Sequence, residues 1–542
     1  MMLRSMKIIF KRFHTALGLL TLWIAVLGGL MACNHPTRSF RIIAGSGNAT
    51  FEPILKRFGQ QNGIDIRINY KGSLDIMQLL QAGHLDYDAV WDADSLWISI
   101  GDEKHIIKDR ESIMRSPVVF GIKKPIAQKI GWIGREISVQ DILDQVEKEK
   151  LRVMMTSATQ SNSGASAYFG FLYAFAGNPD MLTAASLNDP HLGKNVTRLL
   201  RTLERTSESS GWLRDLFLKE YAGYDAMFNY ESHIIELNQA LVKQDKEPLY
   251  IVYPRPGLGI ADFPLSYVDH KDAEKEKIFL ALQRYILSDR VQEEIAAKGR
   301  RVSLVGMTPD RVDKAVFNPD WGVDVTKGVN PLRLPSAPVI LQALNLYQTK
   351  FRKPSFTVYL LDFSGSMAGK GEQQLKQAMR SLLDQKEAGK YLLQGSPEDR
   401  TLVVAFNNTI INEQEIKDWF VTGNDAVGMT GLLNEIEAQR PRGGTNIYLP
   451  VGYALEFMKQ KGIAGRFPAI ILMTDGQSNS GSLEDVKSAM QRTGINNVPV
   501  YGITFGDAST EQLKELADLT GGRVFDGTKD LHEAFLKAKG NN

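Results

Sequence analysis

The sequence contains very little cysteine: a single residue, Cys33, among 542. A chain with one cysteine forms no intrachain disulfide, so its stability depends on ordinary hydrophobic cores. An excess of one charge is also missing, because 64 Lys and Arg residues stand against 62 Asp and Glu, for a net charge of +2. That balance, with 23% charged residues, indicates neither nucleic-acid binding nor disorder. At 542 residues the chain is too long for one core, so two or three domains are expected.

Several motifs of catalysis and metal binding are absent as well. The eight histidines are scattered, and no two stand at a spacing typical of metal ligands. Residues Gly365–Gly371 resemble a phosphate-binding loop only faintly, since the glycine spacing is one residue short and Lys370 is followed by glycine. No Gly-x-Ser-x-Gly hydrolase elbow occurs. Trp and Tyr form no stripe beside basic residues, which argues against binding of single-stranded nucleic acid.

Residues 1–33 have the pattern of a targeting segment. A basic start is followed by an apolar run at Ala16–Leu30, and Leu-Met-Ala then precedes Cys33. Small residues before the sole cysteine resemble a bacterial lipobox, which implies cleavage before Cys33 and lipidation of that residue. In the alternative, Thr15–Cys33 is retained as a single transmembrane anchor. In both cases the rest of the chain is expected outside the cytoplasm. The favoured case is a membrane-anchored lipoprotein of the bacterial cell envelope.

A strand, a polar loop and a helix follow one another near residue 360. Phe356–Leu361 is almost wholly apolar, which predicts a strand buried on both faces, and Glu372–Gln385 has apolar residues at helical spacing. Between them, one carboxylate and two hydroxyls share one edge of a turn, on Asp362, Ser364 and Ser366. Open α/β sheets bind ligands at the carboxyl ends of their strands, where this loop is expected.

Two later segments supply further oxygen donors at the same sheet edge. Thr445 stands on a glycine loop before a helical pattern at Ile447–Lys459, and Asp475 follows the apolar strand Ala469–Met473. Oxygen donors without nearby His or Cys suit Mg²⁺, Mn²⁺ or Ca²⁺ rather than zinc or copper. For any single segment, the capping of a turn or helix is the simpler interpretation. All three segments in this order favour a divalent-metal site.

Together, Asp362, Ser364, Ser366, Thr445 and Asp475 resemble the metal-ion-dependent adhesion site of von Willebrand factor A domains. The resemblance covers residues 354–536 and implies a doubly wound, Rossmann-like α/β fold. It also implies that Ser364 and Ser366 ligate the metal directly and that Thr445 does so in some ligand states. The two aspartates then ligate or act through water. One coordination position is left for an Asp or Glu carboxylate of a protein partner, toward which the metal acts as a Lewis acid.

A second α/β region is expected over residues 40–320. Short apolar strands such as Arg41–Ala44 and Ile64–Tyr70 lead into small polar loops and then helices. Such loops present free backbone N–H groups and hydroxyls to a small polar ligand. These units resemble the two-lobed periplasmic fold of bacterial extracellular solute-binding proteins, of the molybdate- or sulfate-binding kind. The resemblance implies ligand contacts at Ser46, Ser73, Ser163 and Tyr253.

Two aspartates depart from that kind of solute-binding site. Asp92 and Asp94 stand at a strand end that is expected to face the same cleft. There they would repel an oxyanion unless Lys71 or Arg255 offsets their charge. A dedicated oxyanion site is therefore doubtful. A zwitterion, a cationic metabolite, a peptide segment or a purely structural role stay open, as does the bland case of two aspartates solvated at the rim.

The order of elements also predicts how the two regions are joined. In the C-terminal region, apolar strands at Leu402–Phe406, Val498–Phe505 and Arg523–Phe525 alternate with helical patterns, which implies parallel pairing with helices on both faces. Residues 321–353 are interpreted as a linker, because several Pro and Gly residues fall near their start.

Two binding functions compete, and neither is enzymatic. The favoured one is an envelope-tethered binding protein that captures an acidic group of a protein partner through its metal site. Its solute-binding-like region then takes a small ligand or adds a second docking surface. The alternative is an accessory solute receptor for a membrane transporter. Metal-dependent hydrolysis ranks third, because it needs a general base and a substrate pocket near Asp362 that the sequence does not name.

Overall fold

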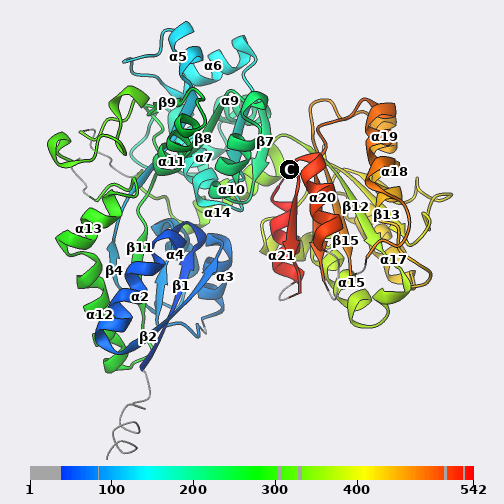
Figure 1. The fold of residues 1–542 in the computed structure, drawn as a ribbon, viewed down its shortest axis with the longest axis horizontal. Helices are drawn as coiled ribbons and strands as arrows, with labels where there is room; N and C mark the ends of the chain where they lie inside the picture. Colours follow the sequence, from blue (N-terminus) through cyan, green and yellow to red (C-terminus); the bar gives the residue numbers. More distant parts are fainter. Residues whose placement is uncertain are drawn as a thin grey trace, which may run out of the picture.

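The computed structural model describes residues 38–83, 85–302, 307–326, 332–475, 477–505, 510–528 and 531–541. They form three β-sheets with helices packed against them, two in the N-terminal part and one in the C-terminal part (Figure 1). The targeting segment and Cys33, with the lipidation predicted there, lie outside the described residues. Among the described residues, no helix has the length and apolar character needed to cross a bilayer.

The first lobe is built on a five-stranded sheet in the order β2-β1-β3-β11-β4. Along β1 the apolar residues serve both faces, because Phe40 and Ile42 enter the large core while Ile43 enters a smaller one behind it. β11 joins from far along the chain and runs antiparallel to β3 and β4. The elements are β1 (Arg38–Gly45), β2 (Ile64–Lys71), β3 (Ala89–Trp91), β4 (Ile107–Ser112), β11 (Pro264–Val268), α2 (Glu52–Asn62), α3 (Ser73–Ala82), α4 (Ser95–Gly101), α12 (Ala273–Ile286) and α13 (Asp289–Ala296).

The second lobe has a six-stranded sheet with the path β10-β5-β8-β6-β7, and β9 pairs with β5. Helix α7 is buried along almost its whole length, and a Cβ on its Gly170 would meet the Gly257 carbonyl at 2.1 Å. Only glycine allows that close approach. The elements are β5 (Ser116–Lys123), β6 (Val153–Thr156), β7 (Leu203–Ser207), β8 (Ala226–Tyr230), β9 (Leu249–Val252), β10 (Ile260–Ala261), α5 (Lys124–Lys129), α6 (Val139–Glu149), α7 (Asn162–Phe175), α8 (Ala184–Leu187), α9 (Pro190–Arg201), α10 (Ser210–Lys219) and α11 (Glu231–Lys243).

The C-terminal domain has a six-stranded sheet in the order β14-β13-β12-β15-β16-β17. From β13 to β17 the strands pair in parallel, as predicted, with a hydrophobic core on each face. The sequence does not predict the antiparallel edge strand β14, which is three residues long and buries none of them. The elements are β12 (Ser355–Asp362), β13 (Arg400–Phe406), β14 (Phe420–Thr422), β15 (Phe467–Thr474), β16 (Val500–Thr504), β17 (Arg523–Asp526), α15 (Lys370–Leu383), α16 (Gln385–Lys390), α17 (Ala426–Ala438), α18 (Tyr448–Lys461), α19 (Leu483–Thr493), α20 (Thr510–Thr520) and α21 (Leu531–Lys539).

Much of the segment interpreted as a linker is packed on the second lobe. Trp321 and Val323 are buried in a hydrophobic cluster of that lobe. Helix α14 (Ala337–Leu346) follows, and the hydroxyl of Tyr168 donates a hydrogen bond to the Ala343 carbonyl (2.8 Å). Apolar side chains decide the place of this segment in spite of its Pro and Gly residues. Residues 321–353 stay a predicted linker, and in their described part Trp321 and Val323 pack on the second lobe while α14 contacts helices of both lobes.

The last strand and helix of the C-terminal domain contact both lobes. Arg523, at the start of β17, forms an ion pair with Glu208 of the second lobe (2.5 Å). Glu533, in the first turn of α21, pairs with Lys71 of the first lobe (2.6 Å). In Figure 1, α21 lies on the side of its domain that faces the two lobes. The three sheets are therefore joined by more than the covalent chain.

Candidate metal site and interlobe cavity

The predicted metal-site loop begins where β12 ends, at Asp362. The Ser364 N–H donates to Asp362 Oδ1 (2.8 Å), which holds the loop against the strand end. The Gly365 N–H donates to the Gly443 carbonyl (2.9 Å), so the glycine loop that carries Thr445 lies against this turn. A Cβ on Gly365 would stand 3.3 Å from that carbonyl, tighter than most real contacts, and glycine avoids this crowding.

The end of β15 brings Asp475 to the same place. Ser366 Oγ donates to Asp475 Oδ1 (2.9 Å), and Ser364 Oγ lies 3.1 Å from Ser366 Oγ. Thr474 Oγ1 donates to Asp362 Oδ2 (2.6 Å), which ties the two strand ends together. Four of the five residues predicted from the sequence therefore lie in one hydrogen-bonded cluster. The fifth, on the glycine loop, is buried beside it.

The cluster combines two carboxylates with neutral hydroxyls. Burial raises the pKa of Asp362, and the nearby charge of Asp475 also raises it. The hydrogen bonds from Thr474 and Ser364 lower this pKa but do not outweigh burial. Carboxylates this close repel each other unless a cation stands with them. The residues therefore fit a divalent cation that prefers hard oxygen ligands. No group of three or more His, Cys, Asp or Glu side chains suited to a metal occurs in the described part of the chain, so a site here depends on hydroxyl ligands too.

A cavity of about 430 Å³ lies between the two N-terminal lobes. Three helices begin at its wall: α3 at Ser73, α7 at Asn162 and α10 at Ser210. Each follows directly on a strand of its lobe, as α/β topology requires. Free N–H groups at helix starts favour a negatively charged ligand. Ser46 and Ser73, two of the predicted ligand contacts, line this cavity.

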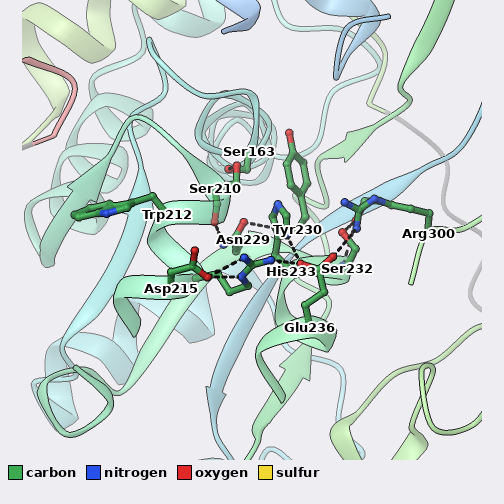
Figure 2. Close-up of polar contacts among 12 residues, drawn as sticks. Ser163, Ser210, Trp212, Asp215, Asn229, Tyr230, Ser232, His233, Glu236 and Arg300 are labelled. Atoms are coloured by element: carbon green, nitrogen blue, oxygen red, sulfur yellow. Dashed lines mark hydrogen bonds and ion pairs between the residues drawn. The ribbon is translucent and has the colours of Figure 1, made fainter. Parts of the chain in front are cut away.

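A charged group stands on the second-lobe wall of the cavity, formed by Arg214, His233, Glu236 and Arg300. Glu236 pairs with Arg214, lies 3.0 Å from His233 Nδ1 and stands 3.8 Å from Arg300 Nη1. Burial alone raises the pKa of Glu236, but the hydrogen bond with His233 and the charges of the two arginines outweigh it and hold the pKa at about 2. Burial lowers the pKa of His233, so its ring is neutral near pH 7. Figure 2 shows Arg300 entering this group from the side opposite Asp215.

Asp92 and Asp94 are buried rather than solvated at the rim, and neither lines the cavity. Asp92 Oδ1 accepts hydrogen bonds from Ser73 Oγ (2.7 Å) and the Ala93 N–H (2.6 Å), and burial raises the pKa of this carboxyl to about 7. Asp94 Oδ1 caps α4 by accepting from the Leu96 N–H (2.9 Å). Both aspartates therefore support the wall from behind. The raised pKa of Asp92 reduces the expected repulsion of a bound anion, which returns as this carboxyl ionises above about pH 7.

Two predicted ligand contacts do not reach the interlobe cavity. Ser163 is buried in the first turn of α7, where its hydroxyl lies 2.7 Å from Ser210 Oγ. Tyr253 donates a hydrogen bond to Glu231 and lines a separate cavity of about 250 Å³, beside Arg255. Tyr253 and Arg255 therefore do not act together with the two serines that line the interlobe cavity. The small polar residues after the strands predicted the helix starts correctly. They did not predict which hydroxyls line the interlobe cavity.

The sequence analysis missed the charged group on the cavity wall. Its members come from three separate segments, and only His233 and Glu236, three residues apart on α11, share an element. Arg300 follows the glycine after α13, a position where a solvent-exposed basic residue is common. No local pattern distinguishes it from an exposed arginine. Only the packing of two phenylalanine rings around it does.

Two regions of the chain match known families. Residues 40–301 match the family of bacterial extracellular solute-binding proteins, and residues 358–533 match the von Willebrand factor type A domain. The first match includes every segment that lines the interlobe cavity. The second includes all five residues of the candidate metal site.

Solved structures resemble the two regions in fold alone. The solute-binding protein of an ABC transporter from Agrobacterium radiobacter K84, in complex with ribitol, is 13% identical with a TM-score of 0.43, over 57% of this chain and 91% of that one. Iron-bound HitA from Pseudomonas aeruginosa is 14% identical with a TM-score of 0.43, over 57% and 98%. A von Willebrand factor type A protein from Catenulispora acidiphila is 20% identical with a TM-score of 0.30, over 35% and 43%.

One curated relative shares a short stretch with this chain. It is the calcium-activated chloride channel regulator 1 of Bos taurus, 30% identical over 96 residues. The stretch is 17% of this chain and spans 10% of the length of that relative.

Proposed function

We propose that this chain, which joins a solute-binding-protein domain to a von Willebrand factor A domain, binds an acidic group of a protein partner through a divalent cation. Mg²⁺ is the expected ion, with Mn²⁺ or Ca²⁺ as substitutes. Its ligands are Asp362, Ser364, Ser366, Thr445 and Asp475. The observation that carries the proposal is the 2.9 Å hydrogen bond from Ser366 to Asp475, because it joins two loops 109 residues apart in the sequence.

The donor set explains why such a site prefers an acidic partner. A bound divalent cation supplies Lewis acidity toward a carboxylate, and the two aspartates with the hydroxyls leave one position of its coordination sphere open for a partner's carboxylate. The chain's own residues orient the ligands: Thr474 holds one oxygen of Asp362, and the Ser364 N–H holds the other. Ser366 is exposed, so a partner's side chain can approach from solvent.

Metal binding is tested by thermal unfolding with and without Mg²⁺, Mn²⁺ or Ca²⁺. The parent protein is expected to gain stability, since a ligand that binds only the folded state stabilises it, by about 2.7 kcal/mol at a hundredfold excess over Kd. Asp475→Ala is expected to lose this gain. Asp526→Ala, which removes a carboxylate at the end of β17 outside the cluster, serves as the matched control and keeps it. A double variant Asp362→Ala/Asp475→Ala that responds to metal like the parent would falsify the assignment.

The acidic partner is tested on the same variants. Protein captured from solubilised cell envelope is expected to depend on the divalent cation and to be lost with Asp475→Ala but kept with Asp526→Ala. Capture that survives both a chelator and Asp475→Ala places the docking surface elsewhere on the chain.

A second role, as receptor for a small solute, is favoured by the cavity that both lobes line. Pockets of this size class, ~300–1,000 Å³, hold small molecules in many proteins. In this role the chain serves a membrane transporter as an accessory receptor. A solute-binding domain indicates a location outside the cytoplasm. We propose that the lipid on Cys33 anchors it to the envelope membrane, which Cys33→Ala tests by shifting the protein to the soluble fraction.

A further inference from the structure

Arg300 is a buried cation whose hydrogen-bonding capacity is largely unused. Its side chain is 1% exposed and lines the interlobe cavity. The rings of Phe51 and Phe263 stand 5.7 and 5.9 Å from its guanidinium carbon. In the described part of the chain, its Nε and Nη1 have no hydrogen-bond partner, and the Glu236 oxygen at 3.8 Å is too far to be one. A buried charge with unmade hydrogen bonds is unfavourable, so we expect a ligand to supply the missing acceptors.

The next residue shows what a satisfied arginine looks like in this protein. Arg301 is equally buried, but its Nε and Nη2 each donate to Glu231 at 2.7 Å, and Nη2 also donates to the Asp324 carbonyl at 2.8 Å. That geometry is the two-point arginine–carboxylate pair found in stable ion pairs. The difference between neighbours points to a ligand for Arg300 rather than to a general surplus of buried arginine.

The backbone around the cavity adds donors of the same kind. The starts of α3, α7 and α10 line it, and Ser161 at the N-cap of α7 makes no side-chain capping hydrogen bond. Ser209 caps the start of α10 by accepting from the Trp212 N–H (3.4 Å), so the start of α7, without a side-chain cap, complements negative charge best. Each of these helices has ten residues or more.

The other charges at the cavity largely cancel, in part because of the C-terminal domain. Glu236 is offset by Arg214 within the wall. At the rim, Lys71 pairs with Glu533 and Glu208 pairs with Arg523, so one partner of each pair comes from α21 or β17. Arg214 is shared with Asp215 (2.8 Å), and Glu236 also stands 3.8 Å from Arg300. Arg300 therefore has a countercharge nearby but no direct hydrogen bond to it, and its Nε and Nη1 stay open to a ligand in the cavity that it lines.

We infer that the interlobe cavity binds a small organic anion, with its phosphate or carboxylate group on Arg300 and its uncharged body in the remaining space. The inference rests on the proposed receptor role and names the chemical class of its ligand. The volume of about 430 Å³ decides between an organic and an inorganic anion, because it has room for on the order of ten water molecules at ~30 Å³ each. A bare tetrahedral oxyanion fills only a small part of that space.

The test compares the parent with Arg300→Met by thermal unfolding, both in an Asp475→Ala background so that the metal site does not respond. The probes are glucose 6-phosphate, citrate, inorganic phosphate, glucose and lysine, each at about 10 mM. At least one organic anion is expected to stabilise the parent, and the Arg300→Met protein is expected to bind it at least about tenfold more weakly, the loss typical of a hydrogen bond to a charged group. Glucose and lysine are expected to have no effect.

Arg300→Met also separates a ligand-binding arginine from a structural one. Replacing a buried, unpartnered charge by an apolar side chain of similar length leaves the ligand-free protein at least as stable as the parent. A structural role predicts a lower unfolding temperature without ligand. Arg300→Lys keeps the charge and loses the planar fork, so it is expected to bind the anion with intermediate affinity.

Opposite changes at the rim sharpen the inference. Glu533→Gln removes a negative charge beside Lys71 and is expected to tighten binding of the anion, whereas Arg523→Gln leaves Glu208 without its partner and is expected to weaken it. Both effects are expected within about fivefold, since these pairs lie near solvent. If no organic anion stabilises the parent, or if Arg300→Met responds as the parent does, the inference fails. A response to glucose or lysine alone overturns it too, yet keeps the receptor role. If inorganic phosphate binds as tightly as the larger anions, the ligand is an inorganic anion instead.

Discussion

The candidate metal site and the interlobe cavity both lie where strands end and helices or loops begin, yet they hold charge of opposite sign. At the metal site, two carboxylates share a cluster with hydroxyls. At the cavity, helix starts stand beside a buried guanidinium whose Nε and Nη1 have no hydrogen-bond partner among the described residues. The α/β topology fixes where a ligand can bind in each domain. A few side chains then decide that one site suits a cation and the other an anion.

The two sites also differ in how far each is complete without a ligand. The metal-site residues hydrogen-bond to one another, so their geometry is set within the cluster itself. Arg300 is set by aromatic packing and leaves its donors open. The first site is therefore preorganised by polar contacts, and the second by apolar ones.

The largest expected effect tests the cavity side of this comparison. Arg301→Met leaves Glu231 buried without its cation, which is expected to lower the free energy of unfolding by about 3–5 kcal/mol, measured by urea denaturation at pH 7. The matched change one residue earlier, Arg300→Met, is expected to leave the free energy of unfolding unchanged or higher. Equal losses in the two variants would show that both arginines are structural.

A pH series comes next, because it tests the carboxylate behind the cavity wall. Burial, together with the nearby charge of Asp262, raises the pKa of Asp92 from 3.8 to about 7. A raised pKa in the folded state means that the stability tied to the protonated group is full below pH 4 and is lost as the pH rises through 7. Asp92→Asn removes this loss.

The measurement for Asp92 is urea denaturation at pH 5 and pH 8. Relative to the parent, Asp92→Asn is expected to gain on the order of 2 kcal/mol between these values. Asp215→Asn, an exposed neighbour of the charged group, is the control and is expected to change little. A constant difference between parent and Asp92→Asn across the series contradicts the buried, protonated carboxyl.

A smaller effect sharpens the metal side. Thr474→Val removes the hydrogen bond to Asp362 Oδ2 while keeping the shape of a buried side chain. Because groups that orient metal ligands affect metal affinity by roughly 10–100-fold, Mg²⁺ is expected to bind that much more weakly to the variant, measured by calorimetric titration. An unchanged affinity means that Asp362 does not depend on Thr474 for its orientation.

The smallest effect concerns the contact between the two halves of the comparison. A double-mutant cycle with Lys71→Gln and Glu533→Gln is expected to give an interaction free energy of about 0.2–1 kcal/mol, as for other partly exposed ion pairs. It is measured by urea denaturation at low and high salt. A value that does not fall with salt contradicts a mainly electrostatic contact.

The sequence predicts a site well where the site's residues lie close together along the chain, and poorly where they come from distant segments. Asp362, Ser364 and Ser366 alternate within five consecutive positions that begin at the end of a buried strand, so their grouping could be predicted. Asp475 could be added because its strand, β15, is as apolar as β12 and pairs beside it. Parallel pairing of adjacent strands then brings their carboxyl ends together without further information.

The cavity could be predicted only in outline. Of the four predicted ligand contacts, the two serines after β1 and β2, Ser46 and Ser73, line it. Arg300 could not be recognised, because its burial depends on Phe51 and Phe263, which are about 250 and 40 residues away along the chain. The sequence alone likewise placed Asp92 facing the cleft, with the rim as the alternative, although the wall built from Ser73 and Ala93 covers it. Tertiary packing, not local pattern, sets these charges.

One feature of the fold constrains every movement of the two lobes. Glu533 forms an ion pair with Lys71 of the first lobe, and Arg523 forms one with Glu208 of the second, so the C-terminal domain links the two lobes. If the angle between the lobes changes, one of these two ion pairs must break, and the C-terminal domain then moves with the lobe to which it stays paired. Its metal-site face then turns relative to the lobe that it has released.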